Sequence, residues 1–347
     1  MAAGWPNKAE PCITITDVSV SIIICTCNRA AHLRQTLAIM GQVRIPAGQA
    51  VELVVVDNAS TDDTAAVVRD AALANMPVKY LYVSQAGKSN ALNVALAQCQ
   101  SEYLLFTDDD VAVPSDWVEQ MVAPLAQGDA DAVVGRVKLA PNLMRPWLSA
   151  WHQVFLAAVD GQLYDSVGLV GANMAFRRAV LERVPAFDPE LGPGPSGAAN
   201  EESLFGRQLR EAGFKLGRVE NATVTHHLEE SRLQRREWLK AARKYGRTQA
   251  YLRHHWEHGS MTAPQLKRLW YGLKLQLRRI LQPPPALNEE GCPAWEISYL
   301  LEMEECRQFC VERHRPRNYS RHGLIKHNAQ SDPDKHRATP THAAVTH

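Results

Sequence analysis

The first half of the chain alternates short apolar runs with stretches of helical periodicity. The apolar runs cover 18–25, 51–56, 78–83, 103–107 and 132–139, and helical patterns cover 30–40, about 60–74, 89–98 and the residues after 114. Strand and helix patterns in regular alternation predict parallel strands with helices on both faces of the sheet. Strands covered on both faces have nearly continuous apolar runs and not a regular alternation, which is the pattern here. We therefore predict an α/β fold with a doubly wound, mostly parallel sheet.

The last third of the chain has mainly helical patterns. A capping-box sequence at 231–234 predicts a helix to about residue 255, a second helix begins at 262–265 and runs to about 281, and a third covers about 294–313. In the second helix, apolar residues recur at the spacing of one helix face: Leu266, Leu269, Trp270, Leu273, Leu277, Ile280 and Leu281. We predict a C-terminal helical extension and, after it, a polar tail that we expect to be disordered.

Polar residues follow four of the strand patterns, at the point where each run ends. They are Thr26 to Arg29, Asp57 and Asn58, Gly87 to Asn90, and Asp108 to Asp110. The carboxyl ends of parallel strands meet at one edge of a sheet, where open α/β folds bind their ligands. We expect these side chains to form one site.

The three consecutive acids, Asp108, Asp109 and Asp110, are the most informative part of that site. Like charges side by side repel and need a cation, and hard oxygen ligands on Asp108 and Asp110 suit Mg²⁺ or Mn²⁺ shared with phosphates. The alternative is a solvated acidic turn.

Basic residues at the same edge predict a nucleotide-diphosphate ligand. Arg29 and Lys88 can neutralise phosphate, and Asp57 can accept hydrogen bonds from a base. Neither a GxGxxG nor a Walker A motif is present, which disfavours dinucleotide cofactors and P-loop NTPase chemistry. Each residue also has a simpler interpretation, as a surface charge or a turn residue.

Composition narrows the class of protein. The chain has 347 residues, 46% of them hydrophobic, so it can form one large domain with an appendage. A net charge of +1 gives no reason to expect nucleic acid as a partner. The seven cysteines lack metal-binding spacing, and we expect reduced thiols in a cytoplasmic protein. We expect no signal peptide, and no apolar run reaches the 18 residues of a membrane span.

Five segments together resemble the family 2 glycosyltransferases with the GT-A fold. They are Ser21 to Arg29, Val54 to Asp62, Phe106 to Asp110, Gly171 to Arg178 and Asn200 to Leu209. The resemblance covers about residues 18 to 228, and the five segments follow the family's order and spacing. It implies a metal-assisted, inverting transfer of a sugar from a nucleotide-diphosphate sugar to a hydroxyl acceptor, either a glycan or a lipid-linked group.

The resemblance also implies roles for individual residues. Asp57 would hold the base, Asp108 the ribose side and the metal, and Asp110 the metal, which would be Mn²⁺ or Mg²⁺. We expect further donor-binding residues at Thr26, Asn28, Arg29, Lys88, Asn93 and Asp109.

Glu202 matches the position of the family's general base, and Glu201 is the alternative. An acidic helix N-terminus capped by Asn200 is a structural reading compatible with both. His226 is the expected third metal ligand, with His227 as the alternative and a structural histidine as the simpler interpretation.

Two loops are candidates for substrate contact. Residues 189–199, rich in Gly and Pro, lie beside the proposed base and would form either a lid or a plain surface loop. Aromatic residues in 142–168 would stack on sugar rings or fill a core: Trp147, Trp151, Phe155 and Tyr164.

Charge is distributed unevenly along the chain. Residues 231–282 contain thirteen Lys or Arg and two Glu, a net charge of +11, which leaves −10 for the rest of a +1 chain. A basic amphipathic helix pair predicts attachment to an anionic membrane surface, at the inner face of the cytoplasmic membrane. The alternative is packing on the catalytic domain with the basic face in solvent.

These observations predict an N-terminal tail over 1–17, a catalytic domain over 18–230, basic helices over 231–313 and a tail over 314–347. The catalytic domain would divide into a nucleotide-binding half, 18–110, and an acceptor half, 111–230. Two other functions stay open. A sugar-1-phosphate nucleotidyltransferase would normally have a Gly-rich loop after the first strand, which is absent here, and an inactive sugar-binding relative would not need the acids.

Overall fold

A single mixed sheet organises the catalytic part of the chain. The computed structural model describes residues 19–160, 168–195 and 197–327, so the predicted tails over 1–17 and 328–347 and the side chain of Tyr164 lie outside the described residues. Within these ranges eight strands pair in the order β3-β2-β1-β4-β7-β6-β8-β5. They are β1 Val20–Thr26, β2 Val51–Asp57, β3 Val78–Tyr82, β4 Tyr103–Asp108, β5 Val111–Ala112, β6 Ala132–Leu139, β7 Met174–Arg177 and β8 Leu216–His226.

The predicted α/β class and mostly parallel sheet are confirmed. Strands β3, β2, β1 and β4 are parallel neighbours, and β6 runs parallel to β8. The short strand β7 is antiparallel to both β4 and β6, and β5 is antiparallel to β8. β5 and β7 were not predicted as strands, because each is too short to produce a recognisable pattern.

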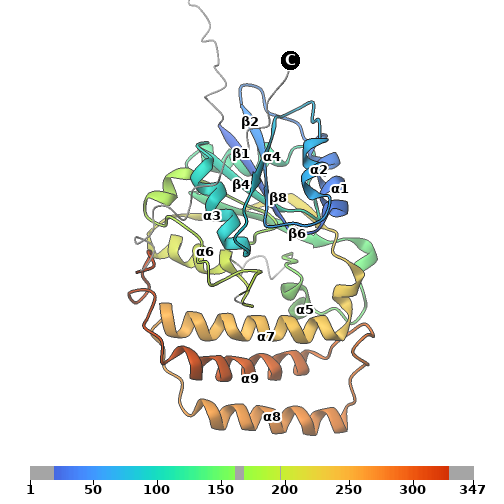
Figure 1. The fold of residues 1–347 in the computed structure, drawn as a ribbon, viewed down its shortest axis with the longest axis vertical. Helices are drawn as coiled ribbons and strands as arrows, with labels where there is room; N and C mark the ends of the chain where they lie inside the picture. The colour runs from blue at the N-terminus through green and yellow to red at the C-terminus, as the bar shows by residue number, and fades with distance from the viewer. Residues whose placement is uncertain (1–18, 161–167, 196, 328–347) are drawn as a thin grey trace, which may run out of the picture.

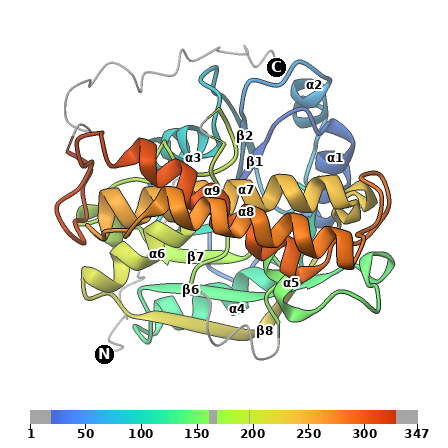
Figure 2. The ribbon, with the colours of Figure 1, turned by 90° about the horizontal axis from the view of Figure 1, so that it is seen from below.

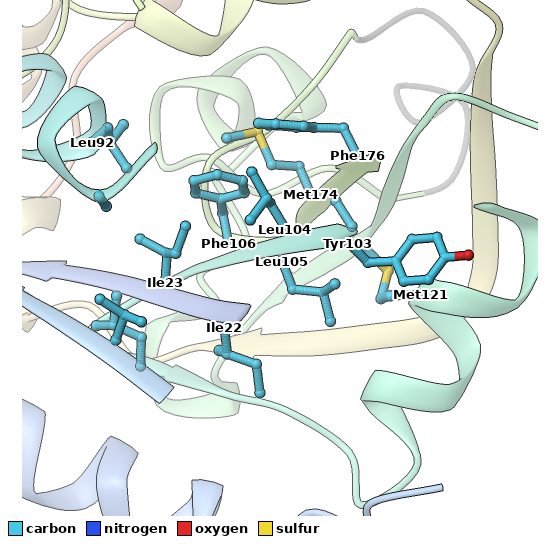
Figure 3. Packing of buried hydrophobic residues seen from close by; sticks show 14 of the residues in the cluster. Ile22, Ile23, Leu92, Tyr103, Leu104, Leu105, Phe106, Met121, Met174 and Phe176 are labelled. Carbon is cyan, nitrogen blue, oxygen red and sulfur yellow. The ribbon is translucent and has the colours of Figure 1, made fainter. Parts of the chain in front are cut away.

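The apolar runs fill the core on both faces of the sheet, as Figure 3 shows. Ile23 and Phe106 are paired neighbours that point to one face, toward Leu92, whereas Ile22 and Leu105 point to the other. All seven residues of β2 are buried. Burial on both faces explains why these strands are apolar without alternation.

Helices cover the sheet as Figure 1 shows, and most of their bounds are close to those predicted. They are α1 Ala30–Met40, α2 Thr64–Arg69, α3 Lys88–Gln98, α4 Trp117–Ala126, α5 Ala150–Phe155 and α6 Glu201–Glu211, with short 3₁₀ turns at Pro141–Leu143 and Arg178–Glu182. The helix predicted over about 60–74 is shorter in the structure, since α2 begins at Thr64 and ends at Arg69. The carboxylate of Asp62 accepts the backbone N–H of Thr64 at 3.1 Å.

Three long helices form a stack beneath the sheet. Figure 1 shows α7 (Arg235–Tyr251) nearest the sheet, then α9 (Ala294–Glu312), then α8 (Pro264–Leu281) outermost. A π-helical turn, Leu252–Trp256, continues α7. One apolar core joins α7 and α9 to the segment that follows β6; it includes Leu143, Phe155, Trp238, Leu239, Ile297 and Leu301.

The predicted capping box at 231–234 is wrong. Residues Glu230–Leu233 form a 3₁₀ turn, α7 begins only at Arg235, and the Ser231 hydroxyl bonds to the Glu229 carboxylate. The two residues that resemble a capping box therefore lie in the turn before the helix.

Acids on α9 compensate part of the basic charge of 231–282. Glu296 is fully buried and pairs with Arg235 at 2.5 Å and with Arg279 at 2.6 Å. Glu304 pairs with Arg247 at 3.1 Å. Much of the local charge of +11 therefore holds the helical stack together.

Residues 314–327 are folded, which corrects our expectation of disorder from residue 314 onward. Tyr319 is 3% exposed and its hydroxyl donates to Asp188 at 2.7 Å. Lys326 pairs with the same carboxylate at 2.7 Å, and Asp188 also accepts from the Tyr251 hydroxyl. One buried acid, Asp188, therefore holds this polar segment against the rest of the fold. Composition alone does not reveal such a partner.

Candidate active site

The ends of β1, β2 and β4 meet at one edge of the sheet. Thr26 lies opposite Asp57, and Cys25 lies opposite Asp108. A cavity of about 690 Å³ opens at this edge and is bounded on the other side by α6 and α7. Its lining includes Arg29, Lys88, Asp108, Asp109, Asp110, Glu201, Glu202 and His226. The predicted convergence of four strand ends is therefore present.

Asp108, Asp110 and His226 form a group that could hold a metal ion. One ligand atom from each lies within 4.8 Å of the others. His226 ends β8 and Asp110 lies beside it, since β5 pairs with β8 there. His227, the alternative ligand, is exposed and does not belong to the group. Two carboxylates and one imidazole are ligand types that Mn²⁺ accepts.

The hydrogen bonds of His226 fit this role. Its Nδ1 lies 3.1 Å from the carbonyl oxygen of Leu156, which can only accept, so Nδ1 carries a hydrogen. The Nε2 lone pair then faces Asp110 Oδ1 at 3.1 Å. Two acceptors face each other there unless a proton or a metal cation lies between them. A backbone carbonyl that fixes the ring in this way is a usual companion of a metal-binding histidine.

Arg29 holds two of the acids in place. Its guanidinium pairs with Asp110 at 2.6 Å and with Asp109 at 3.2 Å. Burial alone would raise the pKa of Asp110, but the charge and hydrogen bond of His226, when both ring nitrogens are protonated, and the charge of Arg29 outweigh burial and keep the pKa below its usual range. Arg29 is therefore ion-paired with two acids of the site and is not an unpaired cation available to a phosphate group.

Asp109 does not belong to the candidate metal group, although it lines the cavity. Thr26 donates to its carboxylate at 2.6 Å, and Asp109 is 3% exposed. Burial raises its pKa to about 6 against the opposing effects of Arg29 and Thr26. The middle acid is therefore bonded to the end of β1, while its two neighbours belong to the metal group.

Lys88 connects the acids of β4 with those of α6. Its ammonium lies 2.8 Å from Asp108 and 3.5 Å from Glu201. Burial lowers its pKa, but the charges of Asp108, Glu201 and Glu202 outweigh burial and raise it well above the usual value. A cation fixed here faces the same space as the metal group.

The two glutamates at the start of α6 have different surroundings. Glu201 is 2% exposed and pairs with Lys88. Glu202 is partly exposed, lines the cavity and has no hydrogen-bond or ion-pair partner among the described side chains. Burial and the charge of Glu201 raise its pKa well above the usual value. Asn200 does not cap this helix with its side chain, since its backbone is left-handed at φ 61°.

The Gly/Pro-rich loop packs against the start of α3. The Pro193 carbonyl accepts the Lys88 backbone N–H at 2.8 Å, and the Leu191 carbonyl accepts the Ser89 hydroxyl at 2.7 Å. At Gly192, φ is +87°, and an added Cβ would lie 2.8 Å from the Glu201 carboxylate. The loop therefore holds Glu201 and the acidic edge together.

Three predicted donor-binding residues do not line the described cavity. Asp57 is 1% exposed and its carboxylate accepts from the Tyr80 hydroxyl and the Ser60 N–H. Asn28 bonds to Thr61, and both amide atoms of Asn93 bond to the backbone of Phe187. For Asn28 and Asn93 these bonds indicate structural roles, and their assignment to the donor stays a prediction. Asp57 remains a prediction, because Asn58 beside it lines the cavity.

Sequence reasoning missed the basic side of the cavity. Its lining also includes Arg207, Arg210, Arg232, Lys244 and Tyr245. These residues lie on α6, on α7 and just before α7. Arg207 falls within the segment Asn200 to Leu209, and no motif marks the other four. Of the aromatic candidates, Phe155 lines the cavity, whereas Trp147 packs edge-on against Trp238 in the core.

Comparison with known proteins identifies the family. Residues 21–184 match the profile of Glycosyl transferase family 2. Residues 21–184, just under half of the chain, belong to this family. The matched residues include the strand ends that carry the acids and Lys88, and the match stops before α6.

The relatives of this family 2 member are distant. The succinoglycan biosynthesis protein ExoA of Rhizobium meliloti (strain 1021) is 25% identical over 215 residues, which are 61% of this chain and 64% of that protein. The poly(ribitol-phosphate) beta-N-acetylglucosaminyltransferase TarS of Staphylococcus aureus (strain MW2) is 28% identical over 119 residues, 34% of this chain and 21% of TarS. The chain thus spans less than two thirds of the length of these curated relatives.

A solved structure shares the fold. The mannosyltransferase PcManGT from Pyrobaculum calidifontis, in complex with GDP-Man and Mn²⁺, superposes with a TM-score of 0.53 at 19% identity, covering 86% of this chain and 88% of that one. This likeness supports the GT-A type of sheet.

Proposed function

We propose that the chain transfers a sugar from a nucleotide-diphosphate sugar to a hydroxyl group, with inversion at the anomeric carbon. One observation carries the proposal. The group Asp108, Asp110 and His226 opens into the same cavity as Glu202, a carboxylate without a partner among the described side chains. A metal-bound diphosphate and a proton acceptor would then share one space.

The metal would be held by Asp108, Asp110 and His226. When bound, Mn²⁺ or Mg²⁺ neutralises charge that develops on the departing diphosphate. The mannosyltransferase that shares this fold was solved with GDP-Man and Mn²⁺, which supports the same type of donor and ion here. Lys88 adds a second cation beside Asp108, at 2.8 Å.

The chemical step needs a base on the acceptor side. As the acceptor oxygen attacks the anomeric carbon, its proton passes to the Glu202 carboxylate, and the bond between that carbon and the diphosphate oxygen breaks. The raised pKa of Glu202 suits a base that works near neutral pH. Glu201 is less suited, because it is buried against Lys88.

The basic side of the cavity favours an acceptor that carries negative charge. Arg232 and Lys244 form no ion pair with any described carboxylate, and both line the cavity. Burial and the charges of Arg232 and Arg247 lower the pKa of Lys244, which indicates a locally positive field. A phosphate or carboxylate near the reacting hydroxyl would be attracted there, as on a lipid-linked or acidic glycan acceptor.

The test is incubation with Mn²⁺ and a panel of nucleotide sugars, followed by measurement of released nucleoside diphosphate. Release that depends on Mn²⁺ and on an intact Glu202 supports the proposal, and the anomeric configuration of the product tests inversion. A nucleotidyltransferase would instead release pyrophosphate from a nucleoside triphosphate and a sugar 1-phosphate. Release of pyrophosphate, with no nucleoside diphosphate from any nucleotide sugar, would reject the proposal.

A further inference from the structure

The outermost helix, α8, presents an apolar face to solvent. Its large apolar side chains are between 55 and 76% exposed: Leu266, Leu269, Trp270, Leu273, Leu277, Ile280 and Leu281. Among the large aliphatic residues of this helix, only Leu275 is buried. It lies on the side that packs against α9. The alternative considered above, in which the basic helices pack on the catalytic domain with the basic face in solvent, is therefore wrong for the apolar face of α8. The helix buries its opposite side and leaves the apolar face uncovered by described residues.

The exposed face is a continuous stripe on an accessible surface. At 3.6 residues per turn, the seven side chains fall within an arc of roughly 120°. The stripe extends from Leu266 to Leu281, so at 1.5 Å per residue it is roughly 23 Å long. Figures 1 and 2 show α8 outermost in the stack, with no labelled element beyond it. A broad surface can therefore meet the whole length of the stripe.

The charge of α8 is entirely positive. It carries five basic residues and no acid, and only Arg279 forms an ion pair with a described carboxylate. On a helical wheel, Lys267 and Lys274 fall along one border of the stripe. Long basic side chains beside an apolar face can reach lipid headgroups while the apolar residues enter the acyl region.

We propose that α8 lies in the plane of an anionic lipid surface, with its seven exposed apolar side chains inserted at the level of the headgroups. The proposal concerns attachment and not the sugar transfer, and it rests on different residues. No helix of the described chain is long and apolar enough to cross a membrane, so α8 would lie on the surface. Trp270 within the stripe belongs to a residue type enriched at that level.

Two other occupants fit less well. A second copy of the chain would bring two helices of the same positive charge together along their length, which is unfavourable. The chain's own last residues, 328–347, contain one large aliphatic residue, Val345, and no aromatic one, so they cannot match a stripe of seven. An anionic lipid surface can bury the apolar side chains and can also pair with the basic ones.

The experiment is co-sedimentation of the full chain with vesicles of phosphatidylcholine, with or without phosphatidylglycerol. Leu273→Gln/Leu277→Gln should weaken binding to the anionic vesicles by about tenfold or more, because two apolar groups no longer insert. Lys267→Gln/Lys274→Gln should weaken it by up to about 30-fold at low salt, at roughly fivefold for each lysine near the surface. Leu287→Gln is the matched control, since Leu287 is 55% exposed, like Leu277, and lies outside α8.

Circular dichroism and nucleotide binding show whether each variant is folded, and sedimentation velocity gives the oligomeric state. Binding that requires phosphatidylglycerol, falls with salt and is lost only in the α8 variants supports the proposal. It is overturned if the wild-type chain stays in the supernatant, if the α8 variants bind as it does, or if the leucine variant dissociates a dimer. Failure here leaves nucleoside diphosphate release unaffected, so the two proposals are tested separately.

Discussion

Glu202→Gln tests the assignment of the base most sharply. The substitution keeps the shape of the side chain but removes its ability to take up a proton as a carboxylate does. Glu202 has no hydrogen-bond or ion-pair partner among the described side chains, and its charge lies near that of Glu201, so the folded state should be as stable or slightly more stable. We therefore expect a loss of chemistry without a loss of structure.

The size of the expected rate loss follows from the role of Glu202 as a general base. A general base contributes about 10²–10⁴-fold to the rate, which corresponds to roughly 2.7–5.4 kcal/mol in the activation free energy. Because Glu202 is assigned to the acceptor proton and not to the metal, the affinity for the nucleotide sugar should change by less than about threefold. A lower kcat with an unchanged donor affinity is the signature of an interaction made in the transition state.

Glu201→Gln is the matched control. It removes the neighbouring charge that raises the pKa of Glu202, and it removes the partner of Lys88 at 3.5 Å. The catalytic carboxylate of Glu202 would then form at lower pH, so the acid limb of the kcat profile should move to lower pH. Turnover should fall less than in Glu202→Gln.

The assay is steady-state release of nucleoside diphosphate across pH, with donor binding measured by calorimetry. If Glu201→Gln is inactive while Glu202→Gln turns over normally, the assignment is off by one residue. If both keep full activity, the base lies elsewhere.

Three further predictions concern the metal, the helical stack and pH. Asp110→Asn should weaken Mn²⁺-dependent donor binding by about 100-fold or more in calorimetry, because it removes a ligand and not only an outer partner. Glu296→Gln should lower the free energy of unfolding by about 3–5 kcal/mol in urea, since the buried Arg235 loses its partner. Hydrogen bonds from His255 and Gln308 and the charge of Arg315 outweigh burial and lower the pKa of Glu312 to about 2. Its contribution to stability, up to about 3 kcal/mol, should be complete above its unfolded pKa near 4.5 and decline as pH falls toward 2.

Each of these has its own control. Asp110→Asn also removes the partner of Arg29, so circular dichroism and urea unfolding check that the variant is folded. Donor binding to the wild-type chain that is equally strong with and without Mn²⁺ would contradict the metal assignment. An unfolding free energy unchanged by Glu296→Gln would show that the buried pair contributes little. Glu312→Gln should flatten the acid limb of the stability curve, and an unaltered limb would exclude this group as its cause.

The strand ends were the part of the site most accessible from sequence. Each of the runs before Thr26, Asp57 and Asp108 is mostly apolar, and parallel pairing brings such ends to one edge of the sheet. The metal group at Asp108 and Asp110 follows from that register and from the family resemblance. His226 lies more than a hundred residues away, and only the pairing of β5 with β8 places it beside Asp110.

Local pattern was a weaker guide where a polar residue had several possible partners. Asn93 and Asn28 are polar side chains near strand ends, yet the backbone of Phe187 and the Thr61 turn take up their hydrogen bonds. The apparent capping box at Ser231 fails for the same reason, because Glu229 bonds to its hydroxyl. A polar side chain forms its hydrogen bonds with the partners that the fold brings closest. The sequence alone does not specify which partners those are.

By itself, the sequence determined the alternation of strands and helices, the acidic edge, and the apolar and basic faces of α8, because these depend on periodicity and on neighbours along the chain. Only the tertiary structure decided which of those faces is buried. Seven apolar residues at helical spacing predict a stripe equally well for a core and for a lipid surface. Here the stack buries Leu275, and the carboxylate of Glu296 on α9 draws in Arg279, so the apolar side of α8 faces outward. The direction of an amphipathic helix depends on the partners available to its polar face, and those partners are distant in sequence.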